Sequence, residues 1–303
     1  RASMKEKQGH FAALFTIFVW GTTFIATKLL LGYFAPVEIL FIRFFMGYIA
    51  LWLAYPKVFS IDRSREKYFI FAGICGVTLY FLLENIALTY TLASNVGVIV
   101  AISPCFTALF SWLLHQDDKP NKLFFIGFLF AILGVYLIST NGQSILEIHP
   151  TGDLLALLAA MVWALYSICT KKISEFGYGT IPMTRRIFFY GLLFMIPALF
   201  LFGFDVSMSD FMHIQVLFNL IFLGLGASAI CFVSWNFALK KLGSIKCSTY
   251  IYLVPVITVV TSMIVLKEKV TIMTWIGMIL TLAGLMLSQR KKGIEDGKHE
   301  MGY

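Results

Sequence analysis

The chain has 303 residues, of which 59% are hydrophobic and only 13% are charged, and its mean hydropathy is +0.84. Soluble domains carry about 25% charged residues, so this composition excludes a soluble globular fold and predicts an integral membrane protein. The net charge of +8 does not indicate a nucleic-acid partner, because the basic residues cluster between apolar runs, where Lys and Arg orient membrane proteins.

Ten apolar runs follow one another along the chain, and we interpret each as a membrane-spanning helix. A bilayer core of about 30 Å needs about 20 apolar helical residues, and continuously apolar runs do not fit the alternating pattern of a membrane β-barrel. We exclude residues 1–3 from the biology, because they precede Met4 and resemble a cloning remnant. In chain order, the predicted spans cover 11–31, 36–55, 68–90, 93–114, 123–141, 152–171, 183–203, 214–238, 245–266 and 271–289.

Lys and Arg are distributed unevenly between the two sides of the predicted bundle. They cluster before the first span, after the second, fourth, sixth and eighth spans, and in the tail. The opposite loops lack basic residues, apart from Lys267 and Lys269 beside Glu268 in the last turn. Because cytoplasmic loops are enriched in Lys and Arg, we expect both termini in the cytoplasm. The expected location is a bacterial inner membrane.

The sequence contains an internal repeat. The stretch 19–28 returns as 162–171, so that Trp20 and Trp163 are 143 residues apart. Each copy holds five spans, an odd number, so the second copy enters the membrane from the opposite side, as in the inverted repeats of secondary transporters. Other pairs keep a spacing of 150 or 151 residues, namely Asn85/Asn236, Pro104/Pro255, Gly127/Gly277 and Gly134/Gly284. We therefore expect a cytoplasmic N-terminus (1–10), a first five-helix repeat (11–141), a second, inverted repeat (152–289) and a basic cytoplasmic tail (290–303).

These features resemble an EamA-type member of the drug/metabolite transporter superfamily, from about residue 10 to 290. The resemblance is carried by Val19-Trp20-Gly21 and Val162-Trp163-Ala164, by Pro104 and Pro255, by Asp118-Lys119 and Glu268-Lys269, and by the paired glycines.

The resemblance implies a central cavity between spans 1, 3, 4, 6, 8 and 9, and transport of small metabolites, often amino-acid export. It implies cavity-facing positions at Trp20, Trp163, Asn85 and Asn236, with the neighbours Tyr80 and Glu84. Glu84-Asn85 corresponds to Trp235-Asn236 in the second half, so the charge occurs in one half only, which departs from a symmetric binding scheme.

Glu84 is the strongest single candidate for a functional side chain. It lies about five residues from the end of its span, or about 8 Å into the membrane at about 1.5 Å per residue. Ionisable residues at the centre of a span cost about 2.5–3.5 kcal/mol on insertion scales and face a cavity or a partner. Arg43 lies at a similar depth, so two interpretations stay open. The two residues form an ion pair that locks helices together, or Glu84 faces the cavity and binds a substrate amine or exchanges a proton.

The two tryptophans lie about ten residues into their spans, where an indole N–H needs a partner or water. We expect them to line the cavity, although Asn85 and Asn236 fit interhelical hydrogen bonds equally well. Aromatic faces with few charges suit a zwitterion or an organic cation. The predicted substrate-binding residues are Trp20, Thr23, Tyr80, Glu84, Asn85, Trp163, Tyr166, Trp235, Asn236 and Tyr252.

Two prolines and two lysines complete the candidates. Pro104 and Pro255 each remove a backbone hydrogen bond within a span and favour a kink, which acts either as a gating hinge or as a static bend. Lys28 and Lys171 end the repeated stretches, and we expect their side chains to extend to the membrane interface.

The sequence predicts a secondary transporter that moves small organic metabolites by alternating access. Amino acids or related zwitterions and cations are the expected substrates, and export is the expected direction. The sequence lacks the phosphate-binding GxxxxGK[ST] loop that would indicate ATP as the driver. It also lacks the HExxH and GxSxG motifs that would indicate an enzyme. Transport of nucleoside- or nucleotide-linked metabolites, or a lipid-handling or receptor-like role without transport, stays open. Expected partners are the small-molecule substrate and the bilayer, without nucleic acid, cofactor or metal, and a homodimer is left open.

Overall fold

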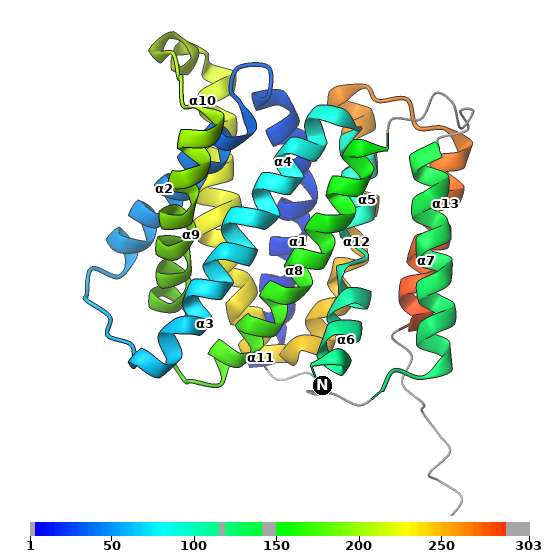
Figure 1. Ribbon diagram of the computed structural model, residues 1–303, viewed down its shortest axis with the longest axis horizontal. Helices are drawn as coiled ribbons and strands as arrows, with labels where there is room; N and C mark the ends of the chain where they lie inside the picture. Colours follow the sequence, from blue (N-terminus) through cyan, green and yellow to red (C-terminus); the bar gives the residue numbers. More distant parts are fainter. Residues whose placement is uncertain (1–3, 115–118, 141–149, 289–303) are drawn as a thin grey trace, which may run out of the picture.

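A computed structural model describes residues 4–114, 119–140 and 150–288, and every regular element in these ranges is helical (Figure 1). The α-helices are α1 (Met4–Leu30), α2 (Pro36–Ala54), α3 (Arg63–Gly73), α4 (Tyr80–Tyr90), α5 (Ala93–Val100), α6 (Ser103–Leu113), α7 (Lys122–Thr140), α8 (Thr151–Ser174), α9 (Thr180–Phe202), α10 (Ile214–Ile221), α11 (Cys231–Ile251), α12 (Leu253–Thr261) and α13 (Ile272–Ser288). Three π-helical segments, η1 (Ile74–Leu79), η4 (Phe222–Ile230) and η5 (Ser262–Leu266), continue the helices next to them, and η3 (Met208–Met212) is a short 3₁₀ helix.

The all-helical prediction is confirmed for the residues that the structure describes, and among them seven helical segments are long and apolar enough to cross a membrane. Three further apolar helices, which match the fifth, ninth and tenth predicted spans, are shorter, at 10–17 residues each. The seven long segments are Glu6–Leu30, Pro36–Ala54, Arg63–Tyr90, Ala93–Leu113, Thr151–Ser174, Thr180–Phe202 and Ile214–Leu242, and the three shorter ones are Lys122–Ile138, Leu253–Leu266 and Ile272–Ser288.

Two helix boundaries differ from the sequence prediction. The predicted break between the eighth and ninth spans is absent, because α11 continues through the basic residues Lys240 and Lys241 as far as Ile251. Lys is a good helix former, so the end of the apolar run is not the end of the helix. The predicted fourth span is instead interrupted between α5 and α6, and Pro104 occupies the first turn of α6, where its missing N–H does no harm.

The π-helical segments η1 and η4 lie in the middle of the third and eighth predicted spans, and the sequence analysis did not anticipate them. Both are rich in small residues, including Gly76 in η1 and Gly224 and Gly226 in η4. Hydrogen bonds from residue i to i+5 widen a helix locally and occur frequently at functional sites. In η4, the carbonyl oxygen of Ala227 accepts a hydrogen bond from a side chain of α1.

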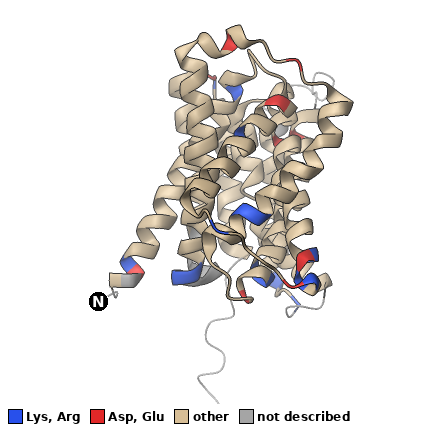
Figure 2. Cartoon of the chain, turned by 90° about the vertical axis from the view of Figure 1, so that its left-hand side faces the viewer, with Lys and Arg blue, Asp and Glu red and all other residues tan. Residues whose placement is uncertain are grey.

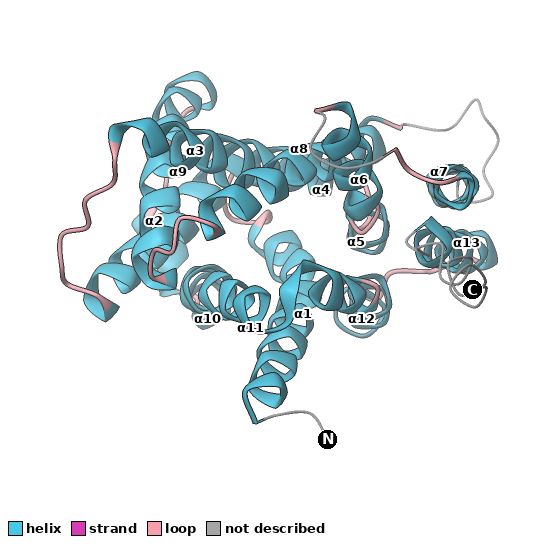
Figure 3. Cartoon of the chain, turned by 90° about the horizontal axis from the view of Figure 1, so that it is seen from below, coloured by secondary structure: helices cyan, strands magenta, loops and turns pink. Residues whose placement is uncertain are grey.

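The helices stand side by side in one bundle, in which α8 lies in a row with α3, α4, α6 and α9, and α1 lies in a second row with α10, α11 and α12 (Figures 1 and 3). Helix α8 packs against α3, α4, α5 and α6, and α1 packs against α11, α12 and η4. Helices α2 and α9 pack together at one side, and α7 and α13 form a pair at the other. Most Lys and Arg gather at the end that carries the N-terminus, as Figure 2 shows. We call this the Lys171 end, and we call the opposite end, where α1 and α4 finish, the Lys28 end.

Glycines bring α7 and α13 into backbone contact. A Cβ added at Gly134 would lie 2.5 Å from the carbonyl oxygen of Gly277, and one added at Gly127 would lie 2.5 Å from the backbone nitrogen of Ser288. A low residue number on α7 faces a high number on α13, so the two helices are antiparallel. Such close approach lets van der Waals contact hold helices together in lipid.

We expect Gly134→Ala to destabilise the protein by about 1–3 kcal/mol, the range for overpacking a tight contact, because the backbone atoms around the new methyl group cannot move independently. The matched control is Gly226→Ala, where the nearest atom, Phe222 Cδ2, lies 3.7 Å from the added Cβ. Thermal unfolding in detergent measures both variants. Equal melting temperatures for the two variants would contradict the packing assigned to α7 and α13.

Candidate functional site

Six aromatic side chains from α1, α4, α8 and α11 meet in the centre of the bundle, and we call them the aromatic cluster: Trp20, Tyr80, Trp163, Tyr166, Phe232 and Trp235. The ring of Phe232 is 2% exposed and lies 5.4 Å from the ring of Trp20 and 6.1 Å from that of Trp163, measured between centroids. The two repeated tryptophans face one another, with centroids 6.0 Å apart and planes at 87°. This edge-to-face geometry is favourable for aromatic pairs.

Trp20 is fixed by a hydrogen bond to a π-helical segment. Its indole N–H donates to the carbonyl oxygen of Ala227 in η4 at 3.0 Å, so the partner expected for a buried indole is a backbone group. Its ring also lies 5.5 Å from that of Trp235. The rings of Trp20 and Trp163 are both directed at side chains of other helices.

On the other side of the cluster, Tyr80 and Tyr166 each lie 4.7 Å from Trp163, measured between ring centroids. The Tyr166 ring lies against Gly76 of η1, with no room for a Cβ there. Both tyrosines are buried, whereas the three tryptophans retain part of their accessible surface.

Glu84 lies one turn of α4 beyond Tyr80 and is 2% exposed. Its Oε1 atom has no hydrogen-bond partner, and the carboxylate interacts electrostatically with Arg43 and Tyr80. Arg43, also 2% exposed, donates from Nε to the Ser228 hydroxyl at 2.6 Å and places its guanidinium 4.3 Å from the centre of the Phe81 ring. The ion pairs within 4.0 Å among the described residues do not include these two charges, so their attraction acts over a longer distance.

Four predicted site residues lie outside the aromatic cluster or direct their polar groups elsewhere. Asn85 donates to the carbonyl oxygen of Pro36 at 3.0 Å and joins α4 to α2. Asn236 donates to the Thr184 hydroxyl at 3.0 Å and joins α11 to α9, so both amides make interhelical bonds. The remaining two are Thr23, whose hydroxyl donates to the Trp20 carbonyl within α1, and Tyr252, whose hydroxyl donates to the Leu285 carbonyl of α13 at 3.4 Å.

The prolines and lysines also have defined places. Pro104 follows the turn that separates α5 from α6, and Pro255 lies in the first turn of α12, directly after the turn at Tyr252. Lys28 is partly buried and binds the end of α4. Its ammonium donates to the carbonyl oxygens of Leu88 at 2.5 Å and Thr91 at 2.6 Å, because these groups at the end of α4 lack helical partners.

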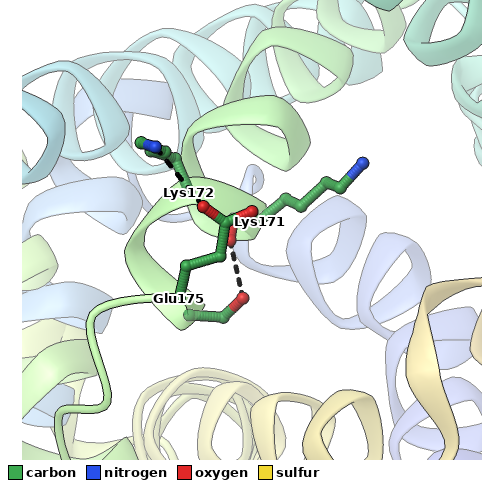
Figure 4. Close-up of polar contacts among 4 residues, drawn as sticks. Lys171, Lys172 and Glu175 are labelled. Carbon is green, nitrogen blue, oxygen red and sulfur yellow. Dashed lines mark hydrogen bonds and ion pairs between the residues drawn. The ribbon is translucent and has the colours of Figure 1, made fainter. Parts of the chain in front are cut away.

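Lys171 differs from its repeat partner. Its side chain is exposed and extends away from the neighbouring pair formed by Lys172 and Glu175, whose charged groups are 3.4 Å apart (Figure 4). The two lysines therefore occupy equivalent positions in the sequence repeat and different surroundings in the structure.

Two hollows of the structure lie away from the aromatic cluster. A small one of about 70 Å³ is lined by residues of α2 and α9, including Trp52 and Arg185. A wide, open one of about 550 Å³ lies beside the start of α1, next to Phe11 and Phe237. Neither hollow includes a residue of the aromatic cluster, so neither is the central cavity that the family resemblance implies.

Sequence reasoning missed several residues of the site. Phe232 could not be selected among thirty phenylalanines, because nothing in its spacing marks it. Ser228 and Ala227 were missed because their roles depend on the π-helical turn. Arg186 keeps the 143-residue spacing to Arg43, yet the buried arginine on α9 is Arg185, which bonds the carbonyl oxygens of Tyr55 and Lys57, while Arg186 pairs with Glu66 at 2.7 Å.

Comparison with known proteins identifies the family. The EamA-like transporter family matches residues 7–140 and again residues 150–289. An uncharacterized transporter of Archaeoglobus fulgidus is 28% identical, over 93% of this chain and 98% of that protein. A probable terminal-alkyne amino-acid exporter of Streptantibioticus cattleyicolor is 25% identical, over 95% of both chains. A probable amino-acid metabolite efflux pump of Salmonella typhimurium is 24% identical, over 94% of this chain and 95% of that protein.

The fold is also found among solved structures. One crystal structure superposes with a TM-score of 0.66 and 18% sequence identity, covering 94% of this chain and 98% of the other, so the likeness concerns the fold. The named relatives are transporters and not enzymes. Because the family matches nearly the entire chain in two stretches, the protein is an integral membrane protein that belongs to the EamA-like transporter family.

Proposed function

We propose that this protein is a secondary transporter that exports small organic solutes carrying an ammonium group and an apolar part, such as amino acids. The observation that carries the proposal is Glu84, a buried carboxylate with an unpartnered Oε1 atom, next to an aromatic cluster whose indoles keep accessible surface. Buried charges inside membrane bundles face a partner or a pathway. The carboxylate would bind the ammonium group, and the rings would bind the apolar part.

The chemistry of the cluster supports a cation or a zwitterion as the solute. Tryptophan faces attract ammonium groups, and this attraction strengthens where water is excluded. Arg43, buried near Glu84, offers a positive charge to a substrate carboxylate once its hydrogen bond to Ser228 is released. Six neutral rings and one carboxylate suit such a solute better than a polyphosphate, which would require several cationic side chains. The printed names of two relatives, an amino-acid exporter and an amino-acid metabolite efflux pump, agree with this class.

The ten-span, inverted-repeat architecture is part of the proposal. The repeat would exchange α1 with α8, α2 with α9, α4 with α11 and η1 with η4, and the packing contacts follow this exchange. Helix α1 packs on α11 as α8 packs on α4, and α2 packs on η4 as α9 packs on η1. Helices α7 and α13, which the repeat would exchange with one another, are antiparallel. The amides of Asn85 and Asn236 make corresponding interhelical bonds. Alternating access would follow from movement of these two sets of helices around the aromatic cluster.

We further propose that the Lys171 end faces the cytoplasm, because it gathers most of the Lys and Arg (Figure 2). In a chain without native cysteines, Ser64→Cys at the start of α3 should react with a membrane-impermeant maleimide only in inside-out vesicles. Ser209→Cys in η3 should react only in intact spheroplasts, and both positions are exposed in the structure. The reverse pattern, or labelling of both from one side, would contradict the topology.

Transport itself tests the site. We expect Glu84→Gln and Trp163→Ala each to lower saturable counterflow of labelled amino acids in proteoliposomes about tenfold or more. The reason is that a charge-assisted contact of about 1.5–3 kcal/mol corresponds to at least that factor. Matched controls are Glu175→Gln and Trp112→Ala, since neither residue belongs to the aromatic cluster. Wild-type counterflow in both site variants would remove Glu84 and Trp163 from the binding site.

A double-mutant cycle measures the attraction between Arg43 and Glu84. Arg43→Gln alone leaves a buried carboxylate without its nearby positive charge, and such changes cost about 3–5 kcal/mol. We expect the Arg43→Gln, Glu84→Gln double variant to lose less stability than the two single variants lose when their losses are added. Melting temperatures of the four proteins provide the measurement. Simple additivity would show that the two charges do not interact.

A further inference from the structure

The Lys28 end of the bundle is closed by a set of contacts around the α4–α5 junction, which we define as residues 88–95. Helix α4 ends at Tyr90 and α5 begins at Ala93. The ammonium of Lys28 donates to the carbonyl oxygens of Leu88 at 2.5 Å and Thr91 at 2.6 Å. Terminal carbonyls carry the negative end of the helix dipole, so a cation from α1 is well placed there.

Glu268 completes the junction from the second half of the chain. Its carboxylate accepts hydrogen bonds from the backbone N–H groups of Ala93 at 2.9 Å and Ser94 at 3.2 Å, which are unpaired amides at the start of α5. Lys28 and Glu268 also attract one another electrostatically. Lys267 has a positive φ of 54°, which is uncommon for a residue other than glycine, so the turn that presents Glu268 is tight.

Helix α8 contributes the third contact. The Thr91 hydroxyl donates to the Asp153 carboxylate at 2.7 Å, and Asn95 donates to the Thr91 hydroxyl oxygen at 3.2 Å. Gly152 lies so close to the end of α4 that an added Cβ would be 2.9 Å from the Cβ of Thr91. The junction is therefore held by α1 and by two elements of the second half of the chain.

The closed junction leaves hydrogen-bonding capacity unused. Thr27 Oγ1, Ser94 Oγ and Asn95 Oδ1 are buried and have no hydrogen-bond partner. The three residues are 0–5% exposed. Buried polar atoms without partners favour any conformation that admits water or another polar group to them. The closed state thus contains groups that an open state would satisfy.

The opposite end of the bundle differs. Lys171, which is the repeat partner of Lys28, is exposed and directed away from the Lys172–Glu175 pair (Figure 4). Of the two lysines at equivalent repeat positions, Lys28 binds the end of α4, whereas the side chain of Lys171 is exposed. This asymmetry is what alternating access requires of a gate that closes one end at a time.

We propose that Lys28 is the residue that gates the outer end, with Glu268 and Asp153 as the residues that position the junction for it. The proposal rests on the transport function and topology proposed above. The ammonium on the end of α4 holds α1, α4 and α5 together while the outer end is closed. Outward opening requires the ammonium to leave the Leu88 and Thr91 carbonyls, so that water reaches Ser94 and Asn95.

The test uses Ser94→Cys as a reporter in the full-length chain without its five native cysteines. Its reaction rate with a small cationic methanethiosulfonate added from outside measures how often the junction opens. We expect Lys28→Met to raise this rate at least about tenfold, equivalent to about 1.4 kcal/mol in favour of opening. Lys28→Arg, which keeps the charge, should restore slow labelling, and the matched control Lys171→Met should leave the rate unchanged.

If Lys28→Met does not elute as a folded species in gel filtration, Glu268→Gln provides a second variant. We expect it to raise the labelling rate of Ser94→Cys by the same factor. Counterflow by Lys28→Met should fall about tenfold in maximum rate, with the half-saturating solute concentration unchanged, because the central site is untouched. Wild-type labelling in folded Lys28→Met or Glu268→Gln protein, or an equal increase in Lys171→Met, would overturn the gate. Labelling needs no solute, so a wild-type chain without counterflow would refute the transport proposal and leave the labelling test of the gate valid.

Discussion

The structure depends on one constraint: inside an apolar bundle, each polar group must find its partner within the protein. Where the helices are regular, the backbone meets this requirement by itself. At the π-helical segments and at the α4–α5 junction it does not, and side chains from other helices supply the bonds. Trp20 donates to a carbonyl of η4, and Lys28 donates to the last carbonyls of α4. The irregular backbone thus determines where distant helices are joined.

The same constraint explains why the centre combines rings with one pair of opposite charges. Rings fill space between helices and require few hydrogen bonds, so they can rearrange without leaving many polar groups unsatisfied. Arg43 and Glu84 are different, because each charge without the other would be costly in this environment. Arg43 is held by Ser228 and Phe81, while Glu84 keeps an unpartnered oxygen. The Oε1 atom of Glu84 is therefore a buried acceptor whose hydrogen-bonding capacity is unused, as is the Oδ1 atom of the neighbouring Asn85.

The sequence allowed prediction of the helices and singled out Trp20 and Trp163, because apolar length and an internal repeat are visible in one chain. It could not identify Phe232, whose importance comes from its position between α1, α4 and α8. It also could not locate the π-helical turns, since the small residues that permit them occur throughout the chain. Charge patterns were partly misleading. The lysines after Leu239 ended the apolar run without ending α11.

Helix α1 connects the aromatic cluster to the gate proposed at its end. Trp20 and Lys28 are eight residues apart, which corresponds to about 12 Å at about 1.5 Å per residue, and both are on the same continuous α-helix. Thr258 of α12 donates to the carbonyl oxygen of Gly21 at 2.7 Å, so α1 is also joined to the second half of the chain. A solute that displaces the Trp20 ring would push on α1, whose end binds the α4–α5 junction through Lys28. Because Trp20 and Lys28 are on one helix, such a displacement would also act on the bonds of Lys28. Binding at the aromatic cluster and opening of the α4–α5 junction would then be coupled through α1.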